Sequence, residues 1–175
     1  MTLTVHELDE LPAAHAAELL AACCGAPRWV SSMVARRPFG SLDAVLAAAD
    51  DVWWSLDQHD WREAFARHPR IGEADTSPSH SERERGWASR EQAGVATAQD
   101  AVRNALVDAN RDYERRFGYI YIVCASGMSA DEMLALARGR LHNSPMVELR
   151  VAAEEQRKIT SLRLAKLLVD DEAAA

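Results

Sequence analysis

Apolar residues recur every three or four positions along most of the chain, which is the spacing of helices that bury one face. Capping signals stand where several of these patterns begin, at Thr4 with Glu7, at Ser41, at Ser129 with Glu132, and at Ser144 with Pro145. The predicted helices cover about residues 4–11, 15–24, 29–34, 41–53, 61–68, 89–117, 129–141 and 144–169.

Two segments interrupt the helical pattern. Residues 69–88 contain two glycines, two prolines and few apolar side chains, which predicts a long loop of the kind that often forms part of a site. Residues 119–125 (YIYIVCA) are apolar and β-prone but have no partner strand, so we expect a buried extended segment. We therefore predict an all-α, single-domain bundle of about eight or more helices over residues 1–175, with one long loop at about 69–88.

Charge and hydropathy exclude several classes of protein. The net charge of -7 and the pI near 5.4 are opposite to the clustered positive charge that nucleic-acid binding requires. No apolar stretch approaches the roughly 20 residues that span a bilayer, and the acidic amino-terminal segment does not fit a secretory or transit peptide. We therefore expect a cytoplasmic protein that binds neither nucleic acid nor membranes.

The three cysteines, Cys23, Cys24 and Cys124, are an odd number with a vicinal pair, which is not a disulfide framework. Free cysteines are among the most buried residues, so we expect reduced, buried thiols. A catalytic thiol stays an alternative, without an obvious helper nearby in the sequence.

The sequence lacks the common metal and phosphate motifs: a glycine-rich phosphate loop, a CxxC pair and HExxH. His59 with Asp57 or Asp60 is the nearest approach to a metal cluster, and an exposed loop between helices is the simpler interpretation. We therefore expect chemistry that needs neither metal nor cofactor.

His68 is the first candidate for a functional residue. Pro69 disfavours helical geometry at the residue before it, so we expect His68 at a helix end, facing the long loop. Histidine titrates near neutrality and suits general acid–base chemistry. A helix carboxyl terminus also favours histidine through its dipole alone, and both interpretations stay open on the residues themselves.

The second candidate is the segment that begins at Ser89. Ser89 could cap the predicted long helix and place Glu91 and Gln92 in its first turn. A carboxylate there stabilises a helix through the macrodipole, which is the structural interpretation. The functional interpretation is that both side chains point into a site, where they could hold a urea-like group by several hydrogen bonds.

The third candidate is Arg163, which follows Ile159 by four residues and shares its helix face. If Ile159 is buried, Arg163 points along the edge of the core and needs a carboxylate or an anionic ligand. A surface arginine that buries only its aliphatic stem is the alternative.

Taken in order, four stretches resemble the 2-oxo-4-hydroxy-4-carboxy-5-ureidoimidazoline (OHCU) decarboxylase family. They are HPRIGE from His68, EQAG from Glu91, NRDYERRFGYIYIVCASG from Asn110, and RGRLHNSPMVELRVAAEEQRKITSLRL from Arg138. The WV…RRPF stretch of residues 29–39 is also similar, so the resemblance covers nearly the whole chain. It implies an all-α homodimer that decarboxylates this urate-derived small molecule to (S)-allantoin, stereospecifically and without a cofactor.

The resemblance also implies site residues. His68 matches the catalytic acid/base and Glu91 its catalytic partner. The family usually has serine where this chain has Ala88, and the neighbouring Ser89 either supplies that hydroxyl or the contact is lost. The expected substrate-binding positions are Pro69, Ala88, Ser89, Gln92, Tyr121, Ile122, Val123, Cys124, Ala125 and Arg163.

Two other functions stay open. The first is a different cofactor-independent enzyme that acts on purine-derived ureides, which would use the same residues to form a different product. The second is a non-catalytic helical interaction module, in which His68, Glu91 and Arg163 would not converge.

Overall fold

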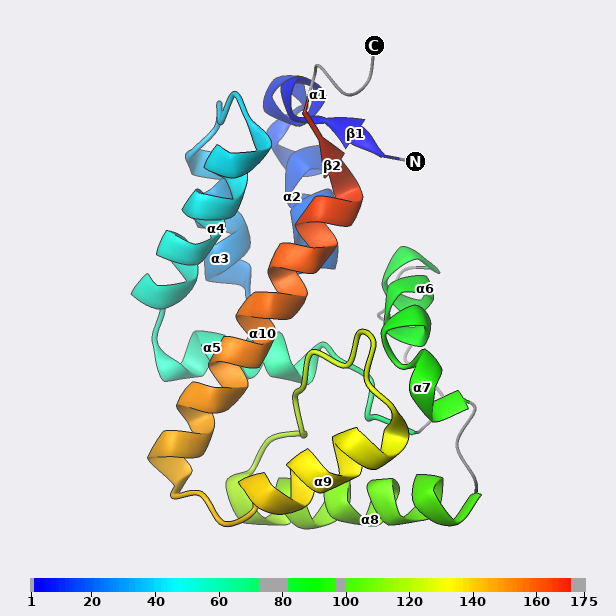
Figure 1. The fold of residues 1–175 in the computed structure, drawn as a ribbon. Coiled ribbons are helices and arrows are strands. Elements are labelled where there is room, and N and C mark those ends of the chain that lie inside the picture. Colours follow the sequence, from blue (N-terminus) through cyan, green and yellow to red (C-terminus); the bar gives the residue numbers. More distant parts are fainter. Residues whose placement is uncertain (1, 73–81, 97–99, 171–175) are drawn as a thin grey trace. The chain divides into compact units, whose positions relative to one another are not determined.

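The computed structural model describes residues 2–72, 82–96 and 100–170, and their fold is almost entirely helical (Figure 1). The helices are α1 (Val5–Glu10), α2 (Ala13–Cys23), α3 (Pro27–Ala35), α4 (Leu42–Ser55), α5 (Gln58–Ala66), α6 (Glu82–Glu91), α7 (Ala93–Ala96), α8 (Asp100–Phe117), α9 (Ala130–Arg140) and α10 (Pro145–Leu167). Two short strands, β1 (Leu3–Thr4) and β2 (Leu168–Val169), pair in parallel. The predicted all-α fold with eight or more helices is confirmed.

The chain divides into two compact units. The first contains residues 1–64 and 157–175, and the second contains residues 65–156. The chain passes from one to the other within α5 and returns within α10. The expectation of a single domain over residues 1–175 stays a prediction.

Local capping sets the starts of several helices as the sequence predicts. Thr4 with Glu7 and Ser129 with Glu132 form complete capping boxes at α1 and α9. The Ser41 side chain accepts a hydrogen bond from the Ala44 N–H at the start of α4.

The first unit buries its apolar residues between the α2, α3 and α4 helices and the second half of α10. The Trp29 indole donates a hydrogen bond to the Ala49 carbonyl, so α3 is held to α4 by a polar contact inside the apolar core. The largest fully buried side chains of this unit are Leu8, Leu20, Trp29, Met33, Trp53, Leu164, Leu167 and Leu168.

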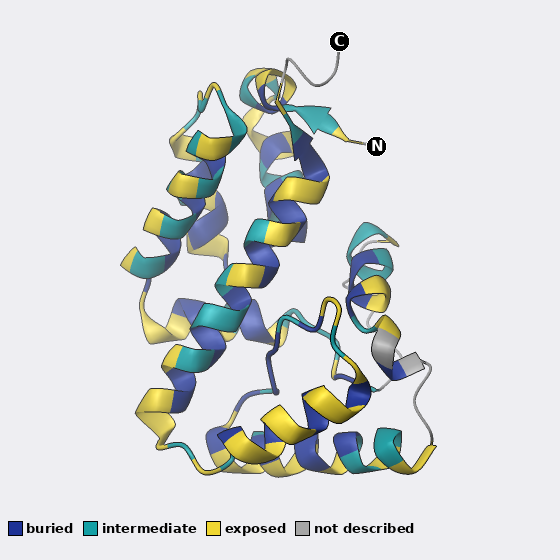
Figure 2. Ribbon diagram, viewed as in Figure 1, coloured by how far each residue is buried: buried dark blue, intermediate teal, exposed yellow. Residues whose placement is uncertain are grey.

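In the second unit, α8 and α9 lie side by side (Figure 1). The α8 helix buries one stripe and exposes the opposite one (Figure 2). Its buried stripe includes Leu106, Tyr113 and Phe117, whose spacing is that of one helical face. Gly118 ends the helix with a φ of 78°, and its N–H donates to the Glu114 carbonyl, as expected for a left-handed cap.

The predictions for residues 69–117 are partly wrong. Residues 82–88 belong to α6 rather than to a loop, while residues 73–81 of that loop lie outside the described residues. The described residues of the expected helix over 89–117 belong to the end of α6, to α7 and to α8. Because α6 has a strongly charged sequence without a clear apolar stripe, periodicity could not reveal it. Ser89 therefore lies inside α6, and Glu91 ends it rather than opening the next helix.

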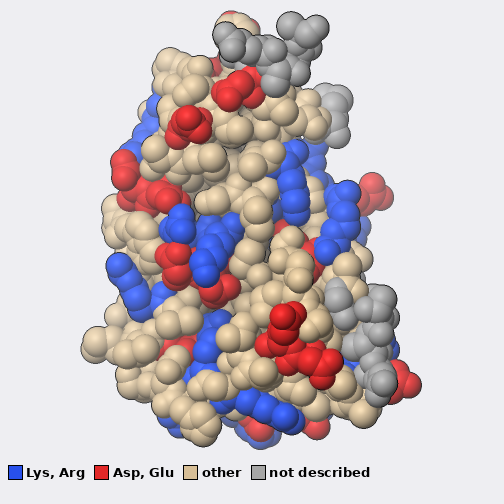
Figure 3. All heavy atoms as spheres, in the orientation of Figure 1, with Lys and Arg blue, Asp and Glu red and all other residues tan. Residues whose placement is uncertain are grey.

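Residues 119–125 form the expected extended segment, without strand assignment, and most of its side chains are buried. Among the described residues, every helix is too short or too polar to span a lipid bilayer. On the face drawn in Figure 3, acidic and basic side chains are interspersed.

Candidate functional site

His68 lies just beyond the carboxyl end of α5, as predicted, and is half-buried. Its backbone N–H donates to the Phe65 carbonyl, which extends the last turn of the helix. Its ring Nε2 lies 2.7 Å from the Oε1 atom of Gln156, which is fully buried on α10. The histidine is therefore held both through its backbone and through its ring.

The residues that follow His68 are anchored one after another. Arg70 forms a two-bond ion pair with Glu114, and the Ile71 carbonyl accepts from the Asn110 side chain at 2.7 Å. Gly72 has a φ of +84°, and a Cβ there would lie 3.3 Å from a methyl group of Val107. The HPRIG turn consequently needs glycine at this position both for its conformation and for its packing.

The end of α6 meets this turn. The Oε1 atom of Gln92 accepts a hydrogen bond from the Gly72 N–H at 3.3 Å. Glu91 and Ala88 are buried, three residues apart on one helix face. Ser89 is exposed, so its hydroxyl is not on that buried face. The structure thus brings the Gln92 side chain, next to Glu91, against the loop that carries His68.

Glu91 lies at the end of a helix, whereas the sequence predicted it in the first turn of one. It ends α6, where the helix dipole disfavours a carboxylate, and it retains only 9% exposure. The first-turn interpretation, in which the macrodipole explains this glutamate, is therefore wrong. The helix macrodipole therefore does not explain why a carboxylate is buried at this position.

The extended segment is fixed through its backbone. The Cys124 N–H donates to the Glu155 carboxylate at 2.8 Å, and the Ile122 carbonyl accepts from Arg140 at 2.8 Å. Tyr121, Ile122, Val123 and Ala125 are buried, and Cys124 is half-buried. Two long-range polar contacts thus hold the segment that the family resemblance assigns to substrate binding.

Arg140 belongs to a buried polar network. Its guanidinium donates to Glu148, which has no exposed surface, and it also contacts the Tyr113 hydroxyl, which itself bonds Glu148. Burial would lower the pKa of Arg140, but its hydrogen bond to Glu148 and the nearby negative charge raise it. The guanidinium therefore stays charged, as a pair with Glu148, inside the second unit.

Tyr121 lies beneath the same arginine. The Arg140 guanidinium is 4.9 Å from the centroid of the Tyr121 ring, and the Tyr121 hydroxyl donates to the Met133 carbonyl. Burial raises the pKa of Tyr121 to about 12. Its hydroxyl therefore remains protonated at neutral pH.

Arg163 belongs to the first unit, with only 6% exposure, and Ile159 beside it is also buried. Its Nη1 donates to the Ala22 carbonyl at 3.3 Å. The interpretation as a surface arginine is therefore wrong. Burial raises the pKa of the neighbouring Cys24 thiol to about 11, so this cysteine is not a thiolate near neutrality.

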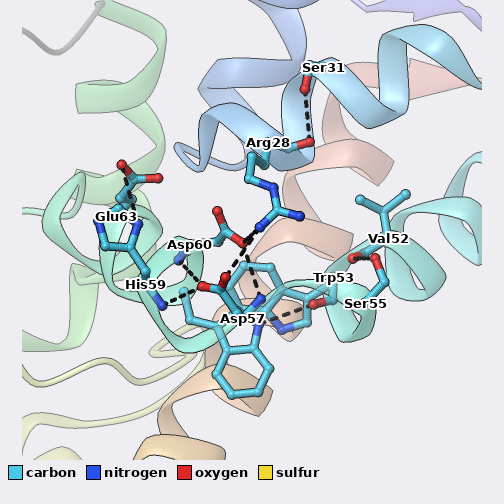
Figure 4. Close-up of polar contacts among 10 residues, drawn as sticks. Arg28, Ser31, Val52, Trp53, Ser55, Asp57, His59, Asp60 and Glu63 are labelled. Atoms are coloured by element: carbon cyan, nitrogen blue, oxygen red, sulfur yellow. Dashed lines mark hydrogen bonds and ion pairs between the residues drawn. The ribbon is translucent and has the colours of Figure 1, made fainter.

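The group of His59, Asp60 and Glu63, at the start of α5, has the composition of a metal site (Figure 4). Asp60 already accepts a hydrogen bond from Arg28 at 2.8 Å. The Asp57 side chain accepts from the N–H groups of His59 and Asp60, which is the geometry of a helix cap. Capping and an ion pair therefore account for the carboxylates of Asp57 and Asp60. The expectation of an exposed loop here is wrong, because His59 and Asp60 lie within α5 and Asp60 is buried.

In the second unit, the end of α6 that carries Glu91 and Gln92 is bonded to the turn that follows His68, within an almost entirely helical fold. The sequence profile of the OHCU decarboxylase family matches residues 9–165, and the chain belongs to this family. The prediction of the family is therefore confirmed.

Relatives and a solved structure agree with this membership. The "Uric acid degradation bifunctional protein TTL" of Arabidopsis thaliana is 38% identical over 149 residues, which are 85% of this chain but 46% of that protein. A 2-oxo-4-hydroxy-4-carboxy-5-ureidoimidazoline decarboxylase of Haloferax volcanii is 27% identical and covers 79% of this chain and 80% of its own. A crystal structure of OHCU decarboxylase in the presence of (S)-allantoin matches with a TM-score of 0.72 and 36% identity, over 84% of this chain and 94% of the other. This chain thus spans about half the length of its Arabidopsis relative.

Several residues that build this region escaped the sequence analysis. Five polar residues on helices each contact a partner far away in the sequence: Asn110, Arg140, Glu148, Glu155 and Gln156. All but Asn110 lie in the final stretch of family resemblance, and Asn110 begins the stretch before it, but no local rule distinguishes them from surface residues.

Proposed function

We propose that this chain catalyses the cofactor-free decarboxylation of OHCU to (S)-allantoin. The observation that carries the proposal is His68, which the family resemblance makes the acid/base and which lies at a helix end with its ring bonded to the fully buried Gln156. A histidine with a fixed ring orientation suits proton transfer at one defined position.

The substrate's own chemistry explains why a cofactor is unnecessary. The carbon that loses CO2 adjoins a C=N bond, so the electron pair of the breaking carbon–carbon bond can enter that double bond. The protein then has to orient the substrate, stabilise the developing charge and deliver a proton to one face of the planar product of CO2 loss. Proton delivery to a single face yields a single enantiomer.

We assign the roles as follows. His68, polarised by Glu91, transfers the proton, and Gln92 holds the ureido group through hydrogen bonds. Pro69, Ala88 and the backbone of residues 121–125 contact the rest of the substrate. Because Ser89 is exposed, we propose that the serine contact usual in this family is missing here. Arg163 is assigned to substrate binding on the family resemblance alone.

We further propose that the chain works as a homodimer in the cytoplasm. The homodimer rests on the family resemblance, and the three free cysteines fit a reducing compartment. Light scattering on the purified protein tests the dimer, since a particle of one 19.3 kDa chain would contradict it.

The test of the reaction follows the circular dichroism of allantoin as it forms. Urate oxidase and the hydrolase of the preceding step supply OHCU in situ, and spontaneous decay of OHCU gives racemic, optically silent allantoin. We expect a rapid signal of the S enantiomer when this chain is added. A signal equal to that without the chain rejects the proposal and favours the non-catalytic interaction module, while loss of OHCU to another product favours a different ureide enzyme.

A further inference from the structure

The bond between His68 and Gln156 joins residues 88 positions apart in the sequence. We propose that Gln156 is a positioning residue that fixes the tautomer of His68, with the proton on Nε2 and Nδ1 as the basic nitrogen. This inference rests on the proposed function and deepens it, since it names the ring atom that exchanges the proton with the substrate.

The chemistry of the two side chains determines the direction of this bond. An amide oxygen has lone pairs and no proton, so Gln156 Oε1 can only accept. At 2.7 Å, Nε2 must therefore be the donor. A neutral imidazole carries one proton, which leaves the lone pair on Nδ1. In the opposite tautomer, with Oε1 in this position, two lone pairs would face each other at this distance and repel.

Burial makes Gln156 suited to this task. The residue has no exposed surface, so the interior favours conformations in which its amide is hydrogen-bonded. Its neighbours one helical turn earlier, Ala152 and Ala153, also have no exposed surface and belong with it to the second unit. A partner held in the interior can impose an orientation on the half-buried histidine.

The backbone beyond the histidine is restrained independently. Asn110 holds the Ile71 carbonyl, and Gln92 holds the Gly72 N–H. These contacts fix where the chain runs, whereas the bond from Gln156 fixes how the His68 ring is turned. Position and protonation of the ring are thus set by different residues, which makes them separable by mutation.

The tautomer can be measured directly on the full chain. Two-bond proton–nitrogen correlation spectra of the ¹⁵N-labelled protein distinguish Nε2–H from Nδ1–H rings, and the His68 signals are identified by their absence in His68→Gln. At a pH where the ring is neutral, we expect the Nε2–H pattern in the wild type. An Nδ1–H ring there overturns the inference, even if no Gln156 variant folds.

Two substitutions test the cause. Gln156→Met keeps the length of the side chain but removes the acceptor, so we expect a mixture of tautomers and a kcat lower by about ten- to a hundredfold with little change in KM. Gln156→Glu retains an acceptor oxygen and should retain the proton on Nε2. A Gln156→Met protein with a pure Nε2–H ring and full kcat overturns the inference.

A matched control removes another amide contact from the same unit. Asn143 donates to Glu148 at 2.7 Å and is half-buried. We expect Asn143→Ala to leave both the His68 spectrum and kcat unchanged, and equal losses in Asn143→Ala and Gln156→Met would overturn a specific role of Gln156. A wild-type chain that forms no (S)-allantoin rejects the proposed function, whereas an active wild type with an Nδ1–H ring rejects this inference alone.

Discussion

The two ends of α5 each carry a histidine among polar groups, and the two environments differ in the burial of the partner. At the first end the His59 side chain is 81% exposed, and its ring lies 3.9 Å from Glu63 (Figure 4). Beyond the second end the His68 ring is bonded at 2.7 Å to an amide with no exposed surface. By composition alone, the first end has more of the residues that bind metals or exchange protons.

The difference teaches that the partner of a residue, more than its type, indicates function. Near His59, Asp60 is paired with Arg28, and Asp57 accepts from the first N–H groups of α5, as a residue at a helix start does. A long-range contact to a buried group needs precise packing from a distant part of the chain. Ordering two distant parts of the chain costs conformational entropy, and a functional site explains that cost better than a solvated helix end does.

The largest effect is expected from removing the His68 side chain, beyond the second end of α5. His68→Ala should lower kcat/KM about 10²–10⁴-fold, or roughly 3–5 kcal/mol in transition-state stabilisation, because positioned acid–base groups contribute this much. The circular dichroism assay measures it, and a thermal melt close to that of the wild type separates lost chemistry from lost structure. Turnover at the wild-type rate would remove His68 from the mechanism.

The second effect concerns stability at the first end. Asp60 is 2% exposed and accepts from Arg28 and from the Asp57 N–H. We expect Asp60→Ala to lower the free energy of unfolding by about 1–3 kcal/mol, since a buried acceptor is lost. Urea denaturation measures it. Arg28→Ala leaves the buried Asp60 carboxylate without its guanidinium partner and should lower the free energy of unfolding by a comparable amount. An unchanged free energy of unfolding in Arg28→Ala would contradict a stabilising role for this ion pair.

Features that depend on adjacent residues could be predicted from the sequence, whereas features that depend on contacts between distant residues could not. The Thr4–Glu7 and Ser129–Glu132 boxes could be predicted because a few adjacent residues contain the whole signal. The buried extended segment could be predicted from its apolar run. Ser89 misled as a cap because α6 begins earlier, in a charged stretch whose burial is confined to Trp87, Ala88 and Glu91.

The candidate site could be predicted only as far as its motifs. His68, Glu91 and Gln92 were found because they lie in short stretches that resemble the family. Gln156 and Glu148 were missed because their function lies in contacts to distant residues, and a single polar residue on a helix gives no sign of being buried. Predicting them would require the packing of α10 in advance.

A smaller effect, on the melting temperature, distinguishes the charge of Asp57 from its capping role at the start of α5. Hydrogen bonds from the N–H groups of Asp60 and His59 hold the pKa of Asp57 below its usual value. A depressed carboxyl pKa stabilises the fold above the unfolded pKa of about 3.9, and this contribution is lost as the pH falls through the folded pKa. Asp57→Asn retains the cap but not the charge, so its melting temperature should lie slightly below that of the wild type at pH 7. The two should converge in acid, and a gap that widens below pH 4 would contradict the sign.

The smallest effect is expected from His59 itself. Its ring is mostly exposed, and the guanidinium of Arg28 already neutralises Asp60, so a divalent cation would have to displace a bound counter-charge. We expect His59→Ala to change the free energy of unfolding by no more than about 0.5 kcal/mol and to leave the rate of (S)-allantoin formation unchanged. Titration calorimetry with zinc should give the same trace for wild type and variant. Saturable zinc binding that disappears in His59→Ala would reverse the comparison, because the first end of α5 would then contain a functional site of its own.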